Sequence, residues 1–515
     1  MHVAFLNPQG NFDPQDRHWT AHSDFGGQLV YVKEVALALG RMGQQVDILT
    51  RRVVDPQWPG FEATLGAYLG EPNVRIVRLP CGGDRFLRKE ELWPHLGTEW
   101  LPNIVAFYAG EDRQPDVVTS HYGDGGLAAA LWHIQGGPPF TFTGHSLGAQ
   151  KLNRLLLDKT RTLADLDSHY HFARRIAAER VAMNHAARII TSTRQERMEQ
   201  YGHPAYHGAV DPAADARFAV LPPGVNLRIF DAETRGPDGS MSLTTCDGRI
   251  AERIERMLAR DVAPERRGLP IILCSSRLDP KKNHVGLVRA FAQSAELQAA
   301  ANLLIVVRGA EDIHSRQTLT PTEGTVLDEI VALCEAHGLW GKVSVFSLES
   351  QSELAAAYRY LVARRSVFAL TSLYEPFGLA PLEAMAAGLP AAVTRNGGPS
   401  ESLFDAETGA EYGVLVDPAD SCDVAAGLLR LVGSGQGQGN EWERFHRAGR
   451  QRVLDCYTWE RTAEGYLAVL EEVRAALAVG GRRARLPIPP YFSHPAPGND
   501  IGLDELKQAY QGRAR

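Results

Sequence analysis

Two carboxylates lie within one short, mostly apolar stretch, YEPFGLAPLEAMAAG at residues 374–388. Glu375 and Glu383 are separated by seven residues, and Pro-Phe-Gly-Leu follows the first. A helix start that exposes backbone N–H groups binds anions, and a nearby carboxylate can accept hydrogen bonds from sugar hydroxyls. The helix dipole would favour an acid here whatever the function, but capping leaves Pro-Phe-Gly-Leu unexplained. We therefore favour a sugar-nucleotide site, with the diphosphate on the amides and the sugars on the acids.

A basic loop, SSRLDPKKN at residues 275–283, supplies the opposite charge. Such loops are most often solvated surfaces, but this one follows a strand-like run in the same half of the chain as the acids. Arg277 and Lys282 could stabilise a departing diphosphate without a metal. The only near match to a metal-binding DxD motif, DLD at 165–167, is better interpreted as a helix start. We expect no essential metal and no other cofactor.

A second set of candidates lies in the first half of the chain. Gly26 and Gly27 open a helix in DFGGQLVYVKE, which allows the backbone to approach a ligand closely but is weak evidence alone. His145 follows the run PFTFTG in TGHSLGAQK; a lone histidine is more often structural, but its place after a strand favours a site.

Basic side chains in the same half could form a pocket for an acidic acceptor group. A single basic side chain is more often a surface charge, so these residues would bind a phosphate only if they lie close together in the fold. The candidates are Lys89, Lys151, Arg174, Arg175 and Arg180.

The elements that must position these residues alternate between strand and helix. Short β-branched runs such as HVAFLN, QVDILT and DVVTSH are separated by helical segments such as QLVYVKEVALALGRMG. A second series follows, including PIILCSSR, NLLIVVRG, SVFALTS and PAAVTRN. Two such series predict an α/β protein with two Rossmann-like domains, whose parallel sheets face a cleft. The candidate residues follow strands, where open α/β sheets bind ligands.

We expect the acceptor-binding domain over residues 1–225 and the nucleotide-sugar domain over 226–460. The polar, Arg-rich segment 231–267 is interpreted as an insertion, and residues 315–324 as a surface loop. Residues 461–515 are expected to form a helix and an extended, Pro-rich tail that packs back on the first domain.

Composition excludes several classes of protein. A chain of 515 residues needs more than one core, and 44% hydrophobic with 22% charged residues is typical of globular domains. The net charge of −7 argues against nucleic-acid binding. The six cysteines form no CxxC pair, the first residues lack a signal-peptide pattern, and no apolar run reaches the roughly 18 residues of a membrane span. We expect a cytoplasmic protein.

Taken together, the motifs resemble a known family. The E-x7-E stretch, SSRLDPKKN, the GGQ loop and TGHSLGAQK resemble retaining GT-B glycosyltransferases of family four. HVAFLNPQGNFDP, GDRFLRKEELWP, SHYGDGGLA and ALTSLYEPFGLAPLEAMA are similar to the sucrose-phosphate synthases, specifically the compact bacterial kind. These motifs cover residues 2 to about 460.

The resemblance implies UDP-glucose as donor, fructose 6-phosphate as acceptor, and sucrose 6-phosphate with UDP as products. It assigns Arg277 and Lys282 to the diphosphate, Glu383 to the ribose, and Glu375 with Phe377, Gly378 and Leu379 to the glucose. His145 would contact the transferred glucose, and Gly26, Gly27 and Gln28 would line the reaction centre. The acceptor would be bound by Lys89, Tyr122, Lys151 and Arg174 or Arg175, the choice of arginine staying open.

The implied mechanism is front-face displacement with retention, in which a diphosphate oxygen takes the acceptor proton, so no hydrolase-like second acid is needed. Longer members of the group carry a phosphatase-like domain, for which this sequence shows no motif, so we expect a separate sucrose-phosphate phosphatase downstream. The regulatory N-terminal extension of plant enzymes is also not seen.

Three alternatives stay open. The nearest is sucrose synthase, which uses free fructose and shares most of these motifs. Another is a related transferase with a different nucleotide sugar, because the sequence does not settle the base. A catalytically dead sugar-nucleotide sensor is disfavoured by the intact Glu375, Arg277, Lys282 and His145. Oligomeric state and allosteric control are not indicated by the sequence.

Overall fold

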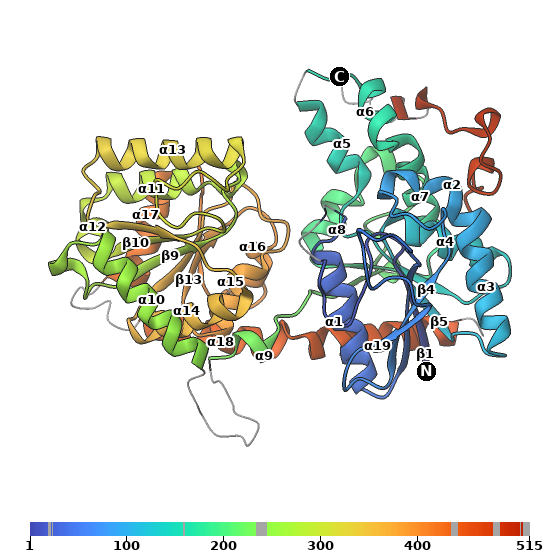
Figure 1. The fold of residues 1–515 in the computed structure, drawn as a ribbon, viewed down its shortest axis with the longest axis horizontal. Coiled ribbons are helices and arrows are strands. Elements are labelled where there is room, and N and C mark those ends of the chain that lie inside the picture. Colours follow the sequence, from blue (N-terminus) through green and yellow to red (C-terminus); the bar gives the residue numbers. More distant parts are fainter. Residues whose placement is uncertain are drawn as a thin grey trace. The chain divides into compact units, whose positions relative to one another are not determined.

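The computed structural model describes residues 1–18, 22, 24–157, 160–232, 245–433, 441–476, 485–504 and 506–507. The chain forms two compact units: Met1–Pro222 with Trp459–Arg515, and Pro223–Thr458 (Figure 1). The chain passes from one unit to the other between residues 222 and 223 and again between residues 458 and 459.

The first unit contains a sheet in the order β3-β4-β2-β1-β5-β6-β7-β8, in which only β3 is antiparallel to its neighbour. The runs expected as strands form it, and the three-residue β3 was not expected. The strands are β1 His2–Leu6, β2 Gln45–Arg51, β3 Leu65–Ala67, β4 Val74–Leu79, β5 Val117–His121, β6 Phe140–Thr143, β7 Arg188–Thr191 and β8 Phe218–Val220.

Helices cover both faces of this sheet, because alternate residues of each strand point to opposite faces. In β1, Ala4 and Leu6 pack with α3, α4 and α7, whereas Val3 and Phe5 pack with α1 and α19. The helices are α1 Gly27–Arg41, α2 Trp93–His95, α3 Leu101–Gly110, α4 Tyr122–Ile134, α5 Gly148–Leu157, α6 Leu163–Tyr170, α7 Phe172–His185, α8 Arg194–Gln200 and α19 Trp459–Ala476. The DLD stretch lies in α6, where Thr162 and Asp165 form a capping box, so the helix-start interpretation is confirmed.

The second unit has a six-stranded parallel sheet in the order β11-β10-β9-β12-β13-β16. Its strands are β9 Ile271–Ser275, β10 Asn302–Val306, β11 Val343–Phe346, β12 Val367–Leu370, β13 Ala391–Thr394 and β16 Val414–Val416, with a separate antiparallel pair, β14 Phe404–Asp405 and β15 Ala410–Glu411. The strands of the six-stranded sheet contribute core residues to both faces, which explains why these runs read as continuous apolar segments.

Two helix layers enclose this sheet (Figure 1). Core residues of α11, α12, α13 and α17 pack with Ile272 and Cys274 of β9, and those of α9, α10, α14 and α15 pack with Ile271 and Leu273. The helices are α9 Leu227–Phe230, α10 Thr245–Asp261, α11 His284–Gln293, α12 Ala295–Ala300, α13 Pro321–Ala336, α14 Gln351–Ala363, α15 Leu379–Ala386, α16 Pro399–Ser402, α17 Ser421–Val432 and α18 Glu441–Cys456.

Two local interpretations need correction. The expected insertion 231–267 contains α10, whose Ile250, Ile254 and Leu258 are buried in the core, so its later part is an integral layer of the unit. Residues 233–244 of that segment lie outside the described residues. The expected loop 315–324 ends at Thr320, which caps α13 through a capping box with Glu323.

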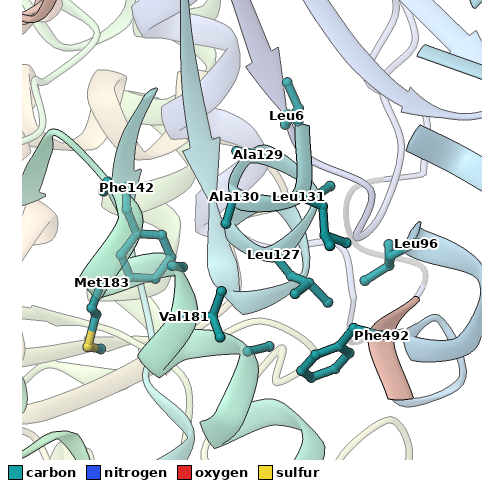
Figure 2. Close-up of a cluster of buried hydrophobic side chains, with 14 of the residues drawn as sticks. Leu6, Leu96, Leu127, Ala129, Ala130, Leu131, Phe142, Val181, Met183 and Phe492 are labelled. Carbon is teal, nitrogen blue, oxygen red and sulfur yellow. The ribbon is translucent and has the colours of Figure 1, made fainter. Parts of the chain in front are cut away.

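The C-terminal segment packs on the first unit. Tyr491 and Phe492 are buried, and Figure 2 shows Phe492 beside Leu96, Leu127 and Leu131 in the core that also contains α4. The close contact leaves no room for a side chain at Gly97, where a Cβ would lie 2.2 Å from the Phe492 carbonyl oxygen. Within the described residues, no helix is long and apolar enough to cross a membrane.

Candidate active site

The candidate residues of the second unit follow β9 and β12, which are adjacent in the sheet. In the sheet, β10 lies on one side of β9 and β12 lies on the other. The strand order therefore reverses between β9 and β12. Loops at the carboxyl ends of two such strands diverge and leave room for a ligand. The loop after β9 contains Arg277 and Lys282, and the loop after β12 contains Glu375.

Lys282 and Glu375 form an ion pair, with 2.6 Å between Lys282 Nζ and Glu375 Oε2. Ser372 Oγ donates to the same carboxylate oxygen at 3.3 Å. Both side chains are partly exposed, so each stays accessible to a ligand. The two residues come together from 93 positions apart.

Backbone contacts fix the turn that presents Glu375. Its N–H donates to the Asn396 carbonyl oxygen, and its carbonyl oxygen accepts from the Gly398 N–H, both at 3.0 Å. A Cβ on Gly397 would lie 2.0 Å from the Glu375 oxygen, so only glycine allows this approach. The turn therefore joins the segments after β12 and β13 through the main chain.

Helix α15 begins immediately after this turn. Gly378, its N-cap, has φ 91°, a left-handed conformation that favours glycine, and Leu379 is the first helical residue. Phe377 is half-buried against Tyr457, with ring centroids 6.1 Å apart. The first N–H groups of the helix, which have no partner within the helix, therefore lie close to Glu375 in the chain.

Glu383 lies further along α15 and is half-buried. Burial raises its pKa to about 7. Neither its carboxylate nor the exposed Arg277 guanidinium has an ion-pair or hydrogen-bond partner among the described residues. An unpaired acid and an unpaired cation in one unit are suited to bind a ligand that carries hydroxyls and negative charge.

In the first unit, His145 lies against a second histidine. The distance from His121 Nδ1 to His145 Nε2 is 2.8 Å, and the rings stack with centroids 5.1 Å apart. Tyr31 and Tyr122 also contact the His145 ring, at 5.0 and 5.3 Å between centroids. Burial lowers the pKa of His145 to about 3, so the ring is neutral at physiological pH.

A pocket lies at the start of α4, where Tyr122, Gly123 and Asp124 line it. Three candidates line it: Lys89, Tyr122 and Arg175. Lys89 Nζ bonds to the buried Asp24 carboxylate, whose other oxygen accepts from the Lys89 N–H at 2.9 Å. Arg175 donates to Glu179 Oε1 at 2.9 Å and to the Ser146 carbonyl oxygen. Burial raises the pKa of Tyr122 to about 12.

Lys151 adjoins this pocket. Its Nζ lies 4.2 Å from the ring centre of Tyr170, a pocket residue, and 3.9 Å from Glu90 Oε1. Burial, followed by the positive charges of Arg175 and Lys89, lowers the pKa of Lys151 to about 8. Three cations therefore converge, and a bound anion would relieve their mutual repulsion.

The structure distinguishes the two neighbouring arginines. Arg175 lines the pocket, whereas Arg174 makes a two-pronged ion pair with Asp500 of the tail, at 2.7 and 2.9 Å. The Arg174 guanidinium also lies 4.4 Å from the ring centre of Tyr491. Arg174 therefore binds the C-terminal tail through Asp500 and Tyr491. Arg180 likewise has a structural contact, since it donates to the carbonyl oxygens of Ala205 and His207.

The glycine loop at the start of α1 is ordered by Gln28, which donates from Nε2 to the Asp24 carbonyl oxygen at 2.9 Å. Gly26 is the N-cap, and a Cβ there would lie 3.0 Å from Gln28 Oε1. A Cβ on Gly27 would meet no described atom within 4 Å. Within this unit, packing alone does not require glycine at position 27.

Sequence reasoning missed several residues that line the pocket. Asp124 is almost fully buried there, and burial raises its pKa to about 6. Its place in SHYGDGG, two residues after Tyr122, was the available signal. The other unforeseen lining residues are Gln9, Glu90, Trp93, Gly123 and Tyr170.

Among the described residues, no group of three or more His, Cys, Asp or Glu side chains is placed to hold a metal ion. The two sites instead offer cations, paired and unpaired acids, and a neutral histidine.

Comparisons with known proteins agree with this division into two units. Residues 26–210 match the Glycosyl transferase 4-like domain family, and residues 256–452 match Glycosyl transferases group 1. A probable sucrose-phosphate synthase from Thermosipho melanesiensis is 42% identical, over 93% of this chain and 98% of that protein. The sucrose-phosphate synthase of Zea mays is 31% identical over 91% of this chain, which spans 47% of the maize protein.

The solved structure of a sucrose-phosphate synthase from Thermosynechococcus elongatus has a similar fold. The TM-score is 0.60 at 22% identity, covering 92% of this chain and 99% of that one. The two α/β units with parallel sheets are those of the GT-B glycosyltransferases, as expected from the sequence.

Proposed function

Because this chain belongs to the sucrose-phosphate synthase family and is a glycosyltransferase of that type, we propose that it transfers glucose from UDP-glucose to fructose 6-phosphate. The products are sucrose 6-phosphate and UDP, and the configuration at the glucose anomeric carbon is retained. The choice of a phosphorylated acceptor rests on the pocket of the first unit, where Lys89, Lys151 and Arg175 converge. Free fructose carries no charge that would need them.

The second unit is assigned the donor. Arg277 and Lys282 bind the diphosphate, and the N–H groups at the start of α15 add to this anion site. The Lys282–Glu375 pair supports this assignment, because a diphosphate near Lys282 competes for its charge and frees Glu375 to accept from glucose hydroxyls. Glu383, unpaired within its unit, accepts from the ribose hydroxyls.

The first unit is assigned the acceptor. Lys151, Arg175 and Lys89 bind its phosphate, while Tyr122 and Gln28 contact the sugar. The buried acids Asp24 and Glu179 hold Lys89 and Arg175 in place before the acceptor arrives. Such prior positioning lowers the entropy cost of binding. Arg174 is left out of this site, because its guanidinium is already engaged by Asp500.

The transfer proceeds on one face of the glucose ring. The bond between the glucose anomeric carbon and the diphosphate oxygen breaks, and the acceptor hydroxyl oxygen bonds to that carbon from the same side. The departing diphosphate oxygen takes the hydroxyl proton, so no protein side chain need act as base. Arg277 and Lys282 stabilise the negative charge that develops on the diphosphate, which is the main contribution expected of preorganised cations.

The deciding assay is the initial rate of UDP release from UDP-glucose, with fructose 6-phosphate and then fructose as acceptor. We expect turnover with the phosphate and none above background with the free sugar. A preference for fructose would reject the phosphate pocket and favour sucrose synthase, leaving the donor assignment intact. Replacing UDP-glucose by ADP-glucose or GDP-mannose, with release of ADP or GDP measured in place of UDP, settles the base and sugar.

Three further expectations belong to this proposal. We expect activity without an added metal, a separate phosphatase that releases sucrose from its phosphate, and a cytoplasmic location. Retention is checked by the anomeric proton coupling of the glucose residue in the isolated product.

A further inference from the structure

The contact between His121 and His145 is set by the fold of the first unit. His121 is the last residue of β5 and His145 follows β6, and these strands are neighbours in the sheet. His121 is fully buried and stacks on Phe5, with ring centroids 5.5 Å apart. His145 has φ 52°, a left-handed conformation that is strained for a residue other than glycine. The His145 ring is therefore held against the His121 ring by a strained backbone conformation.

The surroundings of His121 indicate which ring nitrogen carries its proton. Its Nε2 is buried and has no hydrogen-bond partner among the described residues. A buried N–H without an acceptor costs more than an unpaired lone pair and is rarer in native proteins. The favourable tautomer therefore has the proton on Nδ1, facing His145 Nε2 at 2.8 Å. Burial lowers the pKa of both histidines, so neither ring carries a second proton at neutral pH.

We infer that His121 is a positioning residue that donates from Nδ1 to His145 Nε2 and thereby fixes the proton of His145 on Nδ1. Nε2 of a neutral His145 that accepts a hydrogen bond cannot also carry the proton. His145 is half-buried, and its Nδ1 has no partner among the described residues. His145 therefore presents a hydrogen-bond donor to a ligand, while its lone pair is occupied.

This inference rests on the proposed function for the identity of the ligand: the donor is offered to an oxygen of the transferred sugar. It also gives His145 a defined role. A histidine whose only basic nitrogen is already engaged does not act as the base that removes the acceptor proton, and the departing diphosphate is left to take it.

The test measures the tautomer directly. Full-length protein labelled with ¹⁵N-histidine is examined by long-range ¹H–¹⁵N correlation, with the His145 signals identified by their loss in His145→Gln. We expect His145 to be protonated at Nδ1 and unprotonated at Nε2. A His145 signal protonated at Nε2 in the wild type would overturn the inference, whether or not the protein transfers glucose to fructose 6-phosphate.

Two substitutions separate the hydrogen bond from packing. His121→Asn places a side-chain N–H near the position of Nδ1–H, and we expect it to keep the tautomer and most of kcat. His121→Phe keeps a ring beside Phe5 but removes the donor, and we expect a mixed tautomer with kcat lower by about tenfold. An unchanged tautomer and kcat in His121→Phe would contradict the proposal.

Phe5→Leu is the matched packing control. It removes the stacking partner of His121 but leaves the His121–His145 contact, so we expect a lower Tm with the wild-type tautomer. A tautomer change in Phe5→Leu equal to that in His121→Phe would show that packing, and not the hydrogen bond, sets the proton position. Because the wild-type and His121→Asn spectra decide the question alone, a poorly folded His121→Phe would not leave it open.

Discussion

Binding of a phosphorylated acceptor to the first unit should be coupled to protonation of Lys151. The pKa of this side chain is lowered to about 8, because it is partly buried beside Arg175 and Lys89. As the pH rises through 8, the unliganded protein loses this charge. A bound phosphate dianion favours the charged form, so binding above pH 8 must bring a proton with it.

The size of the effect follows from the pKa. About 10% of Lys151 is neutral at pH 7, about 50% at pH 8 and about 90% at pH 9. Proton uptake per acceptor bound should therefore be about 0.1, 0.5 and 0.9 at these pH values, and the acceptor Kd should rise about tenfold between pH 7 and pH 9. The phosphate itself does not titrate in this range, since its second pKa is about 6.

The assay is calorimetric titration of fructose 6-phosphate into protein saturated with UDP, repeated in buffers of different ionisation enthalpy. Lys151→Arg keeps a charge throughout, so we expect no proton uptake and a Kd independent of pH. Lys151→Met should weaken acceptor binding at every pH by about tenfold to a hundredfold, the range for a lost charged hydrogen bond. Lys342→Met, which removes a lysine bonded to Gln298 in the second unit, is the control.

Wild-type protein that takes up no proton on binding fructose 6-phosphate at pH 8 to 9, and whose acceptor Kd does not change with pH, would refute the coupling to Lys151. A Lys151→Met variant that binds fructose 6-phosphate as tightly as wild type would reject the role of Lys151 itself.

Burial raises the pKa of Glu383 to about 7, so its carboxylate is protonated as the pH falls through 7, and UDP-glucose binding should weaken about tenfold from pH 8 to pH 6. Calorimetry should show that the UDP-glucose Kd depends on pH in the wild type and does not in Glu383→Gln. A wild-type Kd without pH dependence would contradict the ribose assignment. Gly378→Ala introduces a side chain at φ 91° with its Cβ 3.1 Å from the Glu375 side chain, so we expect a lower Tm and weaker donor binding. Gly248→Ala in α10, where a Cβ meets open space, should not lower Tm and should leave donor binding unchanged. Arg174→Ala should lower Tm but leave the acceptor Kd within about threefold, because its guanidinium pairs with Asp500; a loss comparable to that of Lys151→Met would return Arg174 to the acceptor site. Finally, EDTA should leave the rate of UDP release unchanged, and a loss that added Mg²⁺ or Mn²⁺ restores would overturn the expected metal independence.

The local pattern of apolar and polar residues predicted most of the secondary structure. The strands β1 and β9 could be predicted from HVAFLN and PIILCSSR alone, because a short β-branched run that is buried on both faces is visible in a few residues. The exceptions have physical reasons. The strand β3 has three residues, too few for a periodic pattern, and α10 begins in a polar, Arg-rich segment whose buried Ile250, Ile254 and Leu258 recur only every fourth residue.

The candidate site residues were found by type and by their place after strands, and the sequence could go no further than that. It could not choose between Arg174 and Arg175, which are adjacent on α7 and point to different partners. The choice depends on Asp500, which lies 326 positions away, and on the pocket at the start of α4. Asp124 and His121 were overlooked because their burial, which gives each its altered pKa, is a property of the folded unit.

The sequence by itself determined that this chain builds two α/β units and carries the residues of a sugar-nucleotide transferase, since both follow from local periodicity and from motifs within single loops. Only the tertiary structure decided which of those residues touch. The Lys282–Glu375 pair, the His121–His145 contact and the Arg174–Asp500 pair each depend on strand order or on the path of the tail. Ionic and hydrogen-bonding forces act over a few ångströms, so charge states and partners are set by distances in space that the order of residues along the chain does not reveal.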